Sequence, residues 1–265
     1  MALYQAILAY DGSGFVGFQR QAQGRTVQGE VEKALRRLGW SERTILYAGR
    51  TDSGVHAHGQ VIAFRLGWRR SPEALQRALN AHLPADVAVQ ALRPAPADFH
   101  PRYAAVARRY VYYLYAAPVR EPFWRRYAWR VWPAPAPEKL HQAAALFPGR
   151  RDFAALGTPP NPRGTTVRTV YRAAWVPLGP SAWAFDVVAD AFLYRMVRRM
   201  VALQVAVAQG RLAFAALQAA LESPPANPLQ GLAPPQGLFL EAVYYDAADL
   251  QHALAAIPPW LGGTP

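Results

Sequence analysis

Strand-like and helix-like patterns of apolar residues alternate along this 265-residue chain, and their order limits the folds that it can adopt. In the first half, alternating apolar residues predict strands, and apolar residues at the helical period predict helices. The strands are predicted at Ala2–Tyr10, Thr44–Ala48, Gln60–Leu66 and Val87–Leu92. The helices are predicted to begin at Thr26, as N-cap, and at Ser71, which Pro72 and Glu73 follow.

After a bend at Phe99–Pro101, the second half repeats this alternation loosely. Its strands are predicted near Ala107–Tyr115, Val167–Trp175, Trp183–Val188 and Leu238–Tyr244, and its helices near Pro137–Leu146, Leu193–Gln209 and Leu212–Leu221. The tail from Ile257, rich in Pro and Gly, is predicted to be irregular.

These elements predict an α+β fold built from two similar mixed α/β subdomains, with antiparallel sheets and helices on one face. We place an N-terminal subdomain at residues 1–103 and a C-terminal subdomain at residues 104–265. We expect them to form one extended sheet around a central cleft.

The charge and the absence of cysteine narrow the function. The net charge is +12, which favours a polyanionic partner, nucleic acid first, because basic groups on phosphates release condensed counterions. A GC-rich genome would explain why only Lys33 and Lys139 are lysines, but not the net charge. Without cysteine the chain has no disulfide, thiolate nucleophile, zinc ribbon or iron–sulfur cluster. No apolar run predicts a membrane span or a signal peptide, so we expect a cytoplasmic protein.

The polar segment Ala48–Gln60 joins two predicted strands and is longer than a hairpin needs. Within it, Asp52 lies between glycines and two residues after Arg50, whose charge would hold the carboxylate ionised. Such a carboxylate in a basic cleft is a nucleophile or a base. The structural alternative is an Asx-turn, since Asp-Ser-Gly is common turn chemistry.

Other groups offer weaker alternatives. His56 and His58 have metal-binding spacing without a third ligand nearby in sequence, so we predict no metal. Asp186 and Asp190 are spaced to share a strand face and could hold magnesium in a nuclease. The segment Phe123–Trp132 mixes arginines with aromatic residues, which is typical of nucleic-acid surfaces and of sheet packing alike.

The segment Gly49-Arg50-Thr51-Asp52-Ser53-Gly54-Val55-His56-Ala57 resembles the signature of the TruA-type tRNA pseudouridine synthases. Further blocks resemble that family in the family's order from end to end of the chain. They are Tyr10-Asp11-Gly12 with Gln19, Thr26-Val27-Gln28, Asp98-Phe99-His100, Ala107-Arg108-Arg109-Tyr110, Arg168-Thr169, and Phe192 with Met196-Val197-Arg198. Phe18, Arg199 and Ala202 stand where the family usually has Trp, Asn and Gly.

The resemblance implies an isomerase that converts uridine to pseudouridine in the anticodon stem-loop of tRNA, at tRNA positions 38–40, without a cofactor. It implies that Asp52 is the nucleophile, that Arg50 and Arg198 position its carboxylate, and that Tyr110 packs on the target base. It further implies a homodimer with a positively charged cleft.

The spacing of Arg195, Arg198 and Arg199 places them on one face of a predicted helix, and we treat Arg195 and Arg199 as phosphate contacts. The alternative is a solvated cationic stripe. Two other functions stay open for the whole chain: an RNA-binding module without turnover, and a metal-dependent nuclease.

Overall fold

The computed structural model describes residues 1–159, 161 and 163–255, and these pack as two compact units. The first unit contains Met1–Val106 and Phe239–Tyr245. The second contains Ala107–Leu238 and the described residues from Asp246 onward. The first unit thus extends three residues past the predicted boundary and includes a late strand that the prediction placed in the C-terminal subdomain.

The first unit is built on a sheet with the strand order β4-β1-β3-β10. The strands are β1 (Ala2–Tyr10), β3 (His56–Leu66), β4 (Val87–Pro94) and β10 (Leu238–Tyr244), and the two-residue strand β2 (Leu46–Tyr47) also pairs with β3. β1 lies antiparallel to both of its neighbours, whereas β10 runs parallel to β3. The central position of β1 explains its nearly continuous burial.

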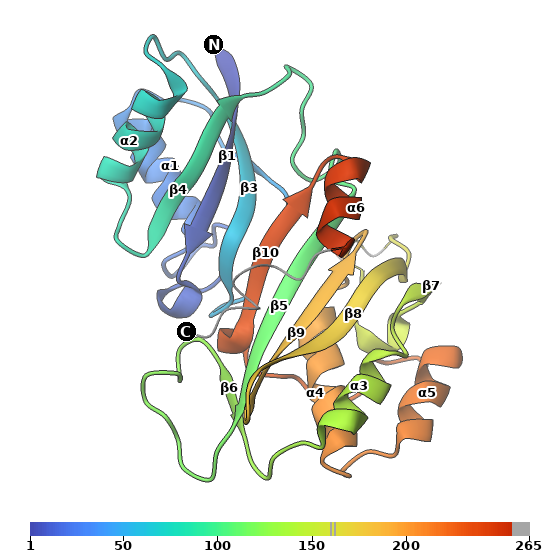
Figure 1. The fold of residues 1–265 in the computed structure, drawn as a ribbon. Helices are drawn as coiled ribbons and strands as arrows, with labels where there is room; N and C mark the ends of the chain where they lie inside the picture. Colours follow the sequence, from blue (N-terminus) through green and yellow to red (C-terminus); the bar gives the residue numbers. More distant parts are fainter. Residues whose placement is uncertain (160, 162, 256–265) are drawn as a thin grey trace. The chain divides into compact units, whose positions relative to one another are not determined.

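Two helices, α1 (Val27–Arg37) and α2 (Pro72–His82), cover this sheet, as Figure 1 shows. Both begin at the predicted caps: the Thr26 hydroxyl accepts from the Gly29 N–H at 3.3 Å, and the Ser71 hydroxyl accepts from the Ala74 N–H at 3.3 Å. Their apolar faces pack into a core whose fully buried members include Leu8, Leu35, Ile62, Phe64 and Leu79. The sequence periodicity therefore predicted these helices correctly.

The second unit has the strand order β5-β9-β8-β7, with β6 parallel to β5. The strands are β5 (Ala107–Ala116), β6 (Trp129–Val131), β7 (Gly149–Asp152), β8 (Val167–Gly179) and β9 (Ala182–Ala189). The helices are α3 (Pro137–Ala144), α4 (Met196–Ala208), α5 (Phe214–Glu222) and α6 (Ala247–Ala255). In both units the strands are mostly antiparallel and mixed with helices, so the predicted α+β class is confirmed.

Helices lie on both faces of the second sheet, rather than on one as predicted. Tyr112 of β5 faces the side of α4, because its hydroxyl reaches the loop that Arg198 also contacts. Arg109 lies three residues earlier and therefore points to the opposite face, where it donates to Ala253 of α6 at 3.4 Å. The helix α6 was not predicted, because Ala247–Ala255 shows no clear apolar period.

A buried ion cluster joins β5, β8 and β9 on the α6 face. Asp186, which is fully buried, accepts from Arg109 Nε at 2.7 Å and Nη2 at 2.6 Å, and from Arg172 Nε at 2.7 Å. Arg172 also donates to the Leu254 carbonyl at 3.3 Å. Both arginines thereby connect the carboxylate to the last turn of α6, where a helix exposes unsatisfied carbonyls.

Some element boundaries were predicted wrongly. β3 begins at His56 and not at Gln60, so the polar loop before it is shorter, and the strand predicted at Thr44–Ala48 is reduced to β2. α4 begins at Met196 and not at Leu193. Arg195, just before it, has a positive φ of 62°, so the helical backbone does not extend back past this residue. The strands β6 and β7 were not predicted. The tail from Ile257 lies outside the described residues.

Among the described residues, no helix combines the length and the apolar character that crossing a membrane requires. The predicted extended sheet and central cleft concern the placement of the two units, and they stay predictions.

Replacing Asp186 by Asn should destabilise the second unit, because two arginines would lose their buried counter-ion. Breaking a buried pair typically costs about 3 kcal/mol or more of the free energy of unfolding. Urea denaturation of Asp186→Asn should show this loss, whereas Asp249→Asn, an exposed carboxylate of α6, should cost less than about 1 kcal/mol. Equal unfolding midpoints for the two variants would contradict a structural role for the cluster.

Candidate active site

The loop that carries Asp52 ends in a tight turn at the start of β3. The Val55 N–H donates to the Asp52 carbonyl at 3.2 Å, and Gly54 has a φ of +76°, a conformation that favours glycine. Asp52 itself is half-buried, and Ser53 beside it is exposed. The turn is closed by a backbone bond, so it does not test the Asx-turn alternative, in which the Asp52 side chain would accept from the backbone.

Three hydrogen bonds fasten this loop to the segment after β1. The Phe18 N–H donates to the Thr51 carbonyl at 3.1 Å, and the Gly54 N–H donates to the Phe15 carbonyl at 3.3 Å. The Ser53 hydroxyl donates to the same Phe15 carbonyl at 3.1 Å. Residues on both sides of Asp52 are thus bonded to one segment, which restricts the backbone of the carboxylate.

Two glycines of that segment allow the close approach. A Cβ atom on Gly12 would lie 2.0 Å from the Val55 carbonyl oxygen, which no side chain tolerates. Gly17 has a φ of +109°, and a Cβ there would lie 3.0 Å from the Thr51 oxygen. These glycines therefore admit the Asp52 loop, a role that the sequence alone did not indicate.

Aromatic side chains pack together beside the loop that carries Asp52. Phe18 is fully buried between Tyr10 and Tyr47, with ring centroids 6.1 and 5.0 Å away. The Tyr10 hydroxyl is hydrogen-bonded to the Thr51 hydroxyl at 2.8 Å, next to Asp52. Sequence reasoning gave these residues no role at the site, although Tyr10 stands in one of the blocks that resemble the family.

Arg50 is exposed on the same loop, and its Nε donates to the Tyr47 hydroxyl at 3.4 Å. The guanidinium has five N–H donors, so this long bond leaves most of its capacity for other groups. The first unit thus presents a half-buried carboxylate and an exposed cation two residues apart. A carboxylate in this setting can act as a nucleophile or as a base.

The two histidines after the loop serve packing and pairing. His56 is buried, accepts from the Gly12 N–H at Nδ1 at 3.0 Å, and stacks on Phe239 with centroids 4.5 Å apart. His58 is hydrogen-bonded to Glu241 at 2.9 Å, and this bond raises the pKa of its imidazole. The described residues contain no group of three or more His, Cys, Asp or Glu side chains placed to hold a metal ion.

The predicted magnesium ligands are also engaged elsewhere. Asp186 is held by Arg109 and Arg172 in the buried cluster, and Asp190 accepts from the N–H groups of Thr169 at 3.1 Å and Ala191 at 2.6 Å. A carboxylate surrounded by arginines does not attract a divalent cation. The nuclease reading thereby loses its candidate ligands.

The other candidate residues belong to the second unit. Tyr110 on β5 is half-buried and meets the Phe192 ring edge to face, with centroids 5.0 Å apart. Tyr112, two residues further along the strand and so on the same face, is fully buried and donates to the Pro234 carbonyl at 2.8 Å. Burial raises the pKa of the Tyr112 phenol well above its ordinary value, although Arg198 opposes this shift. Of the two, Tyr110 is the ring with accessible surface.

Arg198 on α4 is 9% exposed, and its position is fixed by the loop that follows α5. Its Nε donates to the Ala233 carbonyl at 2.8 Å, and the Ala233 N–H donates back to the Arg198 carbonyl at 3.1 Å. This reciprocal pair of bonds holds Arg198 to the loop through its Nε and its backbone.

Arg195 and Arg199 differ in their surroundings. Arg195 is exposed and lies over the Tyr194 ring, 4.7 Å from its centroid. Arg199 donates to the carbonyls of Leu229 and Leu156, each at 3.1 Å. Burial, and after it the charges of Arg195 and Arg198, lower the pKa of the Arg199 guanidinium. Phosphate binding stays a prediction for both, and it fits the exposed Arg195 better.

Replacing Glu241 by Gln should lower the pKa of His58 toward its ordinary value, because the carboxylate that favours the protonated ring is lost. A raised pKa means that this pair stabilises the fold at low pH and stops contributing as the pH rises through the pKa of folded His58. Following the imidazole proton signals of His58 by NMR from pH 5 to 9 would measure it. An unchanged midpoint in Glu241→Gln would show that another group holds the proton.

Known proteins resemble this chain over nearly its full length. A family model described as tRNA pseudouridine synthase matches residues 6–104 and 143–246. A protein of Methylacidiphilum infernorum named tRNA pseudouridine synthase A is 43% identical over 91% of this chain and 95% of its own length. Proteins of the same name from Lactiplantibacillus plantarum and Moorella thermoacetica are 38% and 42% identical, over 94% and 92% of this chain and 96% and 100% of their own lengths. The chain therefore belongs to the tRNA pseudouridine synthase family.

Proposed function

We propose that this chain converts uridine to pseudouridine in the anticodon stem-loop of tRNA, at positions 38–40, with Asp52 as the nucleophile. The family establishes the general reaction, isomerisation of uridine in tRNA. The observation that carries the role of Asp52 is its loop: a half-buried carboxylate, two residues from an exposed arginine, on a backbone bonded at both sides to one glycine-rich segment. That rigidity is what positioning a reacting group requires.

The reaction breaks the C1′–N1 glycosidic bond, turns the detached uracil, and joins C1′ to C5. C5 then loses its proton and N1 gains one. No atom is gained or lost overall, so the enzyme needs no oxidant, reductant or cofactor. Asp52 can attack C1′, add to C6 of uracil, or remove the C2′ proton to give a glycal. Each route requires one persistent anion beside the sugar or base, which Asp52 supplies.

The second unit supplies the remaining roles in this proposal. Tyr110 presents the accessible part of its ring to the detached base, and stacking of this kind is worth about 1–3 kcal/mol per base. Arg198, whose Nε donates to the Ala233 carbonyl, is assigned the role of holding the Asp52 carboxylate ionised. Arg50 assists from the loop itself. Arg195 and Arg199 are assigned to phosphates of the stem-loop.

The partners and location follow from the same proposal. The net charge of +12 supports binding of an RNA polyanion. We keep a homodimer that works on tRNA in the cytoplasm as part of the proposal. No metal takes part in it, since Asp52 and the bases of the RNA carry the chemistry.

An RNA-binding module without turnover is the second candidate, because the charge and aromatic residues would serve it equally well. It gives no reason for the restrained Asp52 loop, since an anion does not improve phosphate binding. The two candidates differ in what happens when only the charge of Asp52 is removed.

Asp52→Asn should abolish pseudouridine formation while the affinity for tRNA stays within about tenfold, because phosphate contacts carry most of the binding. The assay is release of tritium from tRNA that contains 5-tritiated uridine, with chelator present throughout, and affinity is measured separately by filter binding. Asn keeps the shape of the side chain, so a loss of turnover reports the loss of the carboxylate.

Asp249→Asn is the matched control, because it removes an exposed carboxylate of α6 outside the proposed site. It should release tritium at the wild-type rate. Near wild-type release by Asp52→Asn would refute the nucleophile. No release by the wild type either with chelator or in a parallel reaction without it would favour the binding module, and release only without chelator would favour a metal-dependent reaction.

A further inference from the structure

The first unit contains a pocket of about 360 Å³ whose lining no part of the proposed reaction uses. Its walls come from the segment after β1, from α1, from β2 and the residues before it, and from the loop after β4. They are Gln19, Arg20, Gln28, Thr44, Ile45, Leu46, Tyr47, His100, Arg102 and Tyr103. None of these residues is acidic, and two are arginines. The volume of the pocket and the positive charge of its lining arginines suit a small anion with an aromatic part.

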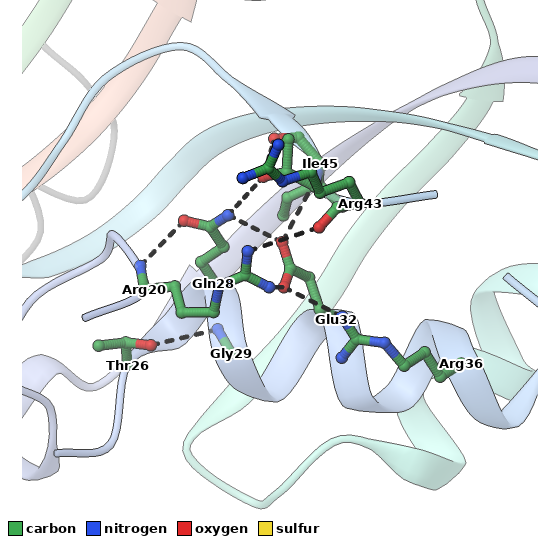
Figure 2. Close-up of polar contacts among 9 residues, drawn as sticks. Arg20, Thr26, Gln28, Gly29, Glu32, Arg36, Arg43 and Ile45 are labelled. Atoms are coloured by element: carbon green, nitrogen blue, oxygen red, sulfur yellow. Dashed lines mark hydrogen bonds and ion pairs between the residues drawn. The ribbon is translucent and has the colours of Figure 1, made fainter. Parts of the chain in front are cut away.

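Glu32 of α1 is fully buried, and its carboxylate contacts two residues of the pocket lining, Arg20 and Gln28, as Figure 2 shows. Glu32 accepts from Gln28 Nε2 at 2.8 Å and pairs with Arg20 and Arg36. Gln28 also donates to the Thr44 hydroxyl at 2.8 Å and accepts from the Arg20 N–H at 2.9 Å. These bonds hold Arg20 at the pocket although 45% of its side chain is exposed.

The outer wall is aromatic and mostly solvent-exposed. Tyr103 is 79% exposed, and its ring lies 4.3 Å from the His100 ring, centroid to centroid. The guanidinium of Arg102 lies 6.0 Å from the Tyr103 centroid. The Arg102 N–H donates to His100 Nδ1 at 3.1 Å, so these three residues form one structured rim. An exposed ring beside a cation has the composition of a nucleotide contact.

The pocket is next to the loop of Asp52. Tyr47 lines the pocket, and its hydroxyl accepts from Arg50 Nε at 3.4 Å. Arg50 is two residues from Asp52, so the Tyr47 side chain contacts both the pocket and the loop that carries Asp52. Phe18, which packs on Tyr47, is bonded through its N–H to Thr51 as well.

We propose that this pocket binds one unstacked nucleotide of the substrate tRNA, close in sequence to the target uridine. Arg20 and Arg102 bind its phosphate, and the base stacks on Tyr103. This inference rests on the proposed function, since the nucleotide belongs to the same RNA that Asp52 modifies. Binding a neighbouring nucleotide stabilises the opened stem-loop from which the target is flipped, a step that loses base stacking.

The test measures the Kd of full-length tRNA at several salt concentrations for the wild type and four variants. Tyr103→Ala should weaken binding about tenfold, and Tyr103→Phe should restore it, because the ring and not the hydroxyl is used. Arg102→Gln should weaken binding and reduce the slope of log Kd against log salt by about 0.7, the share of one phosphate contact. Arg70→Gln, an exposed arginine before α2, is the matched charge control and should leave that slope nearly unchanged.

Tyr103 is exposed, so its replacement does not remove core packing, and a folded Tyr103→Ala can be confirmed by its urea midpoint. The pocket proposal is overturned if Tyr103→Ala binds tRNA within twofold of the wild type, or if the salt slopes of Arg102→Gln and Arg70→Gln coincide. Tritium release by the wild type, measured alongside, reports the proposed reaction separately. Its absence with a normal pocket response would reject the reaction and not the pocket.

Discussion

The contact between the backbone of Gly12 and the carbonyl of Val55 is the constraint on which the first unit depends. β1 and β3 pair antiparallel with Ile7 opposite Val61, so the chain leaving β1 meets the chain entering β3 at one end of the sheet. At that end a Cβ on residue 12 would lie 2.0 Å from the Val55 oxygen. Only glycine fits. The segment after β1 can therefore lie directly against the Asp52 loop and form the bonds from Phe18 and to Phe15 that restrain it.

Arginine serves two distinct purposes in this chain. Arg109 and Arg172 neutralise the buried Asp186, so these side chains hold elements of the second unit together. Arg50 and Arg195 are exposed, and their charge is directed to solvent or to a bound anion. The net charge of +12 is consequently carried by arginines that differ in availability, and only the exposed group can release counterions on binding RNA.

Local signals in the sequence predicted much of the fold. The caps Thr26 and Ser71 and the apolar periods after them predicted α1 and α2, because local hydrogen bonds and one buried face suffice to define such helices. The errors in the strands came from pairing with distant strands. β3 begins at His56, in a polar segment, because its partners β1 and β10 extend there. β6, which follows a long exposed segment, exists through its pairing with β5, which no local pattern reveals.

The site was predictable only in part for the same reason. Glycines on both sides of Asp52, together with Arg50, marked the loop, and resemblance to a family gave the roles. The packing of Phe18 between Tyr10 and Tyr47 could not be read from residues so far apart in the chain. Neither could the burial of Tyr112, since strand alternation treats Tyr110 and Tyr112 alike. The difference between them comes from the loop at Pro234 that covers one ring.

The most direct measurement is chemical mapping of pseudouridine, nucleotide by nucleotide, in unmodified tRNA after incubation with this chain in chelator. Matched tRNAs would carry uridine or cytidine at positions 38, 39 and 40. The account predicts pseudouridine at those positions wherever uridine is present, and at no other position. Pseudouridine confined to another arm of the tRNA, or none at all, would contradict it.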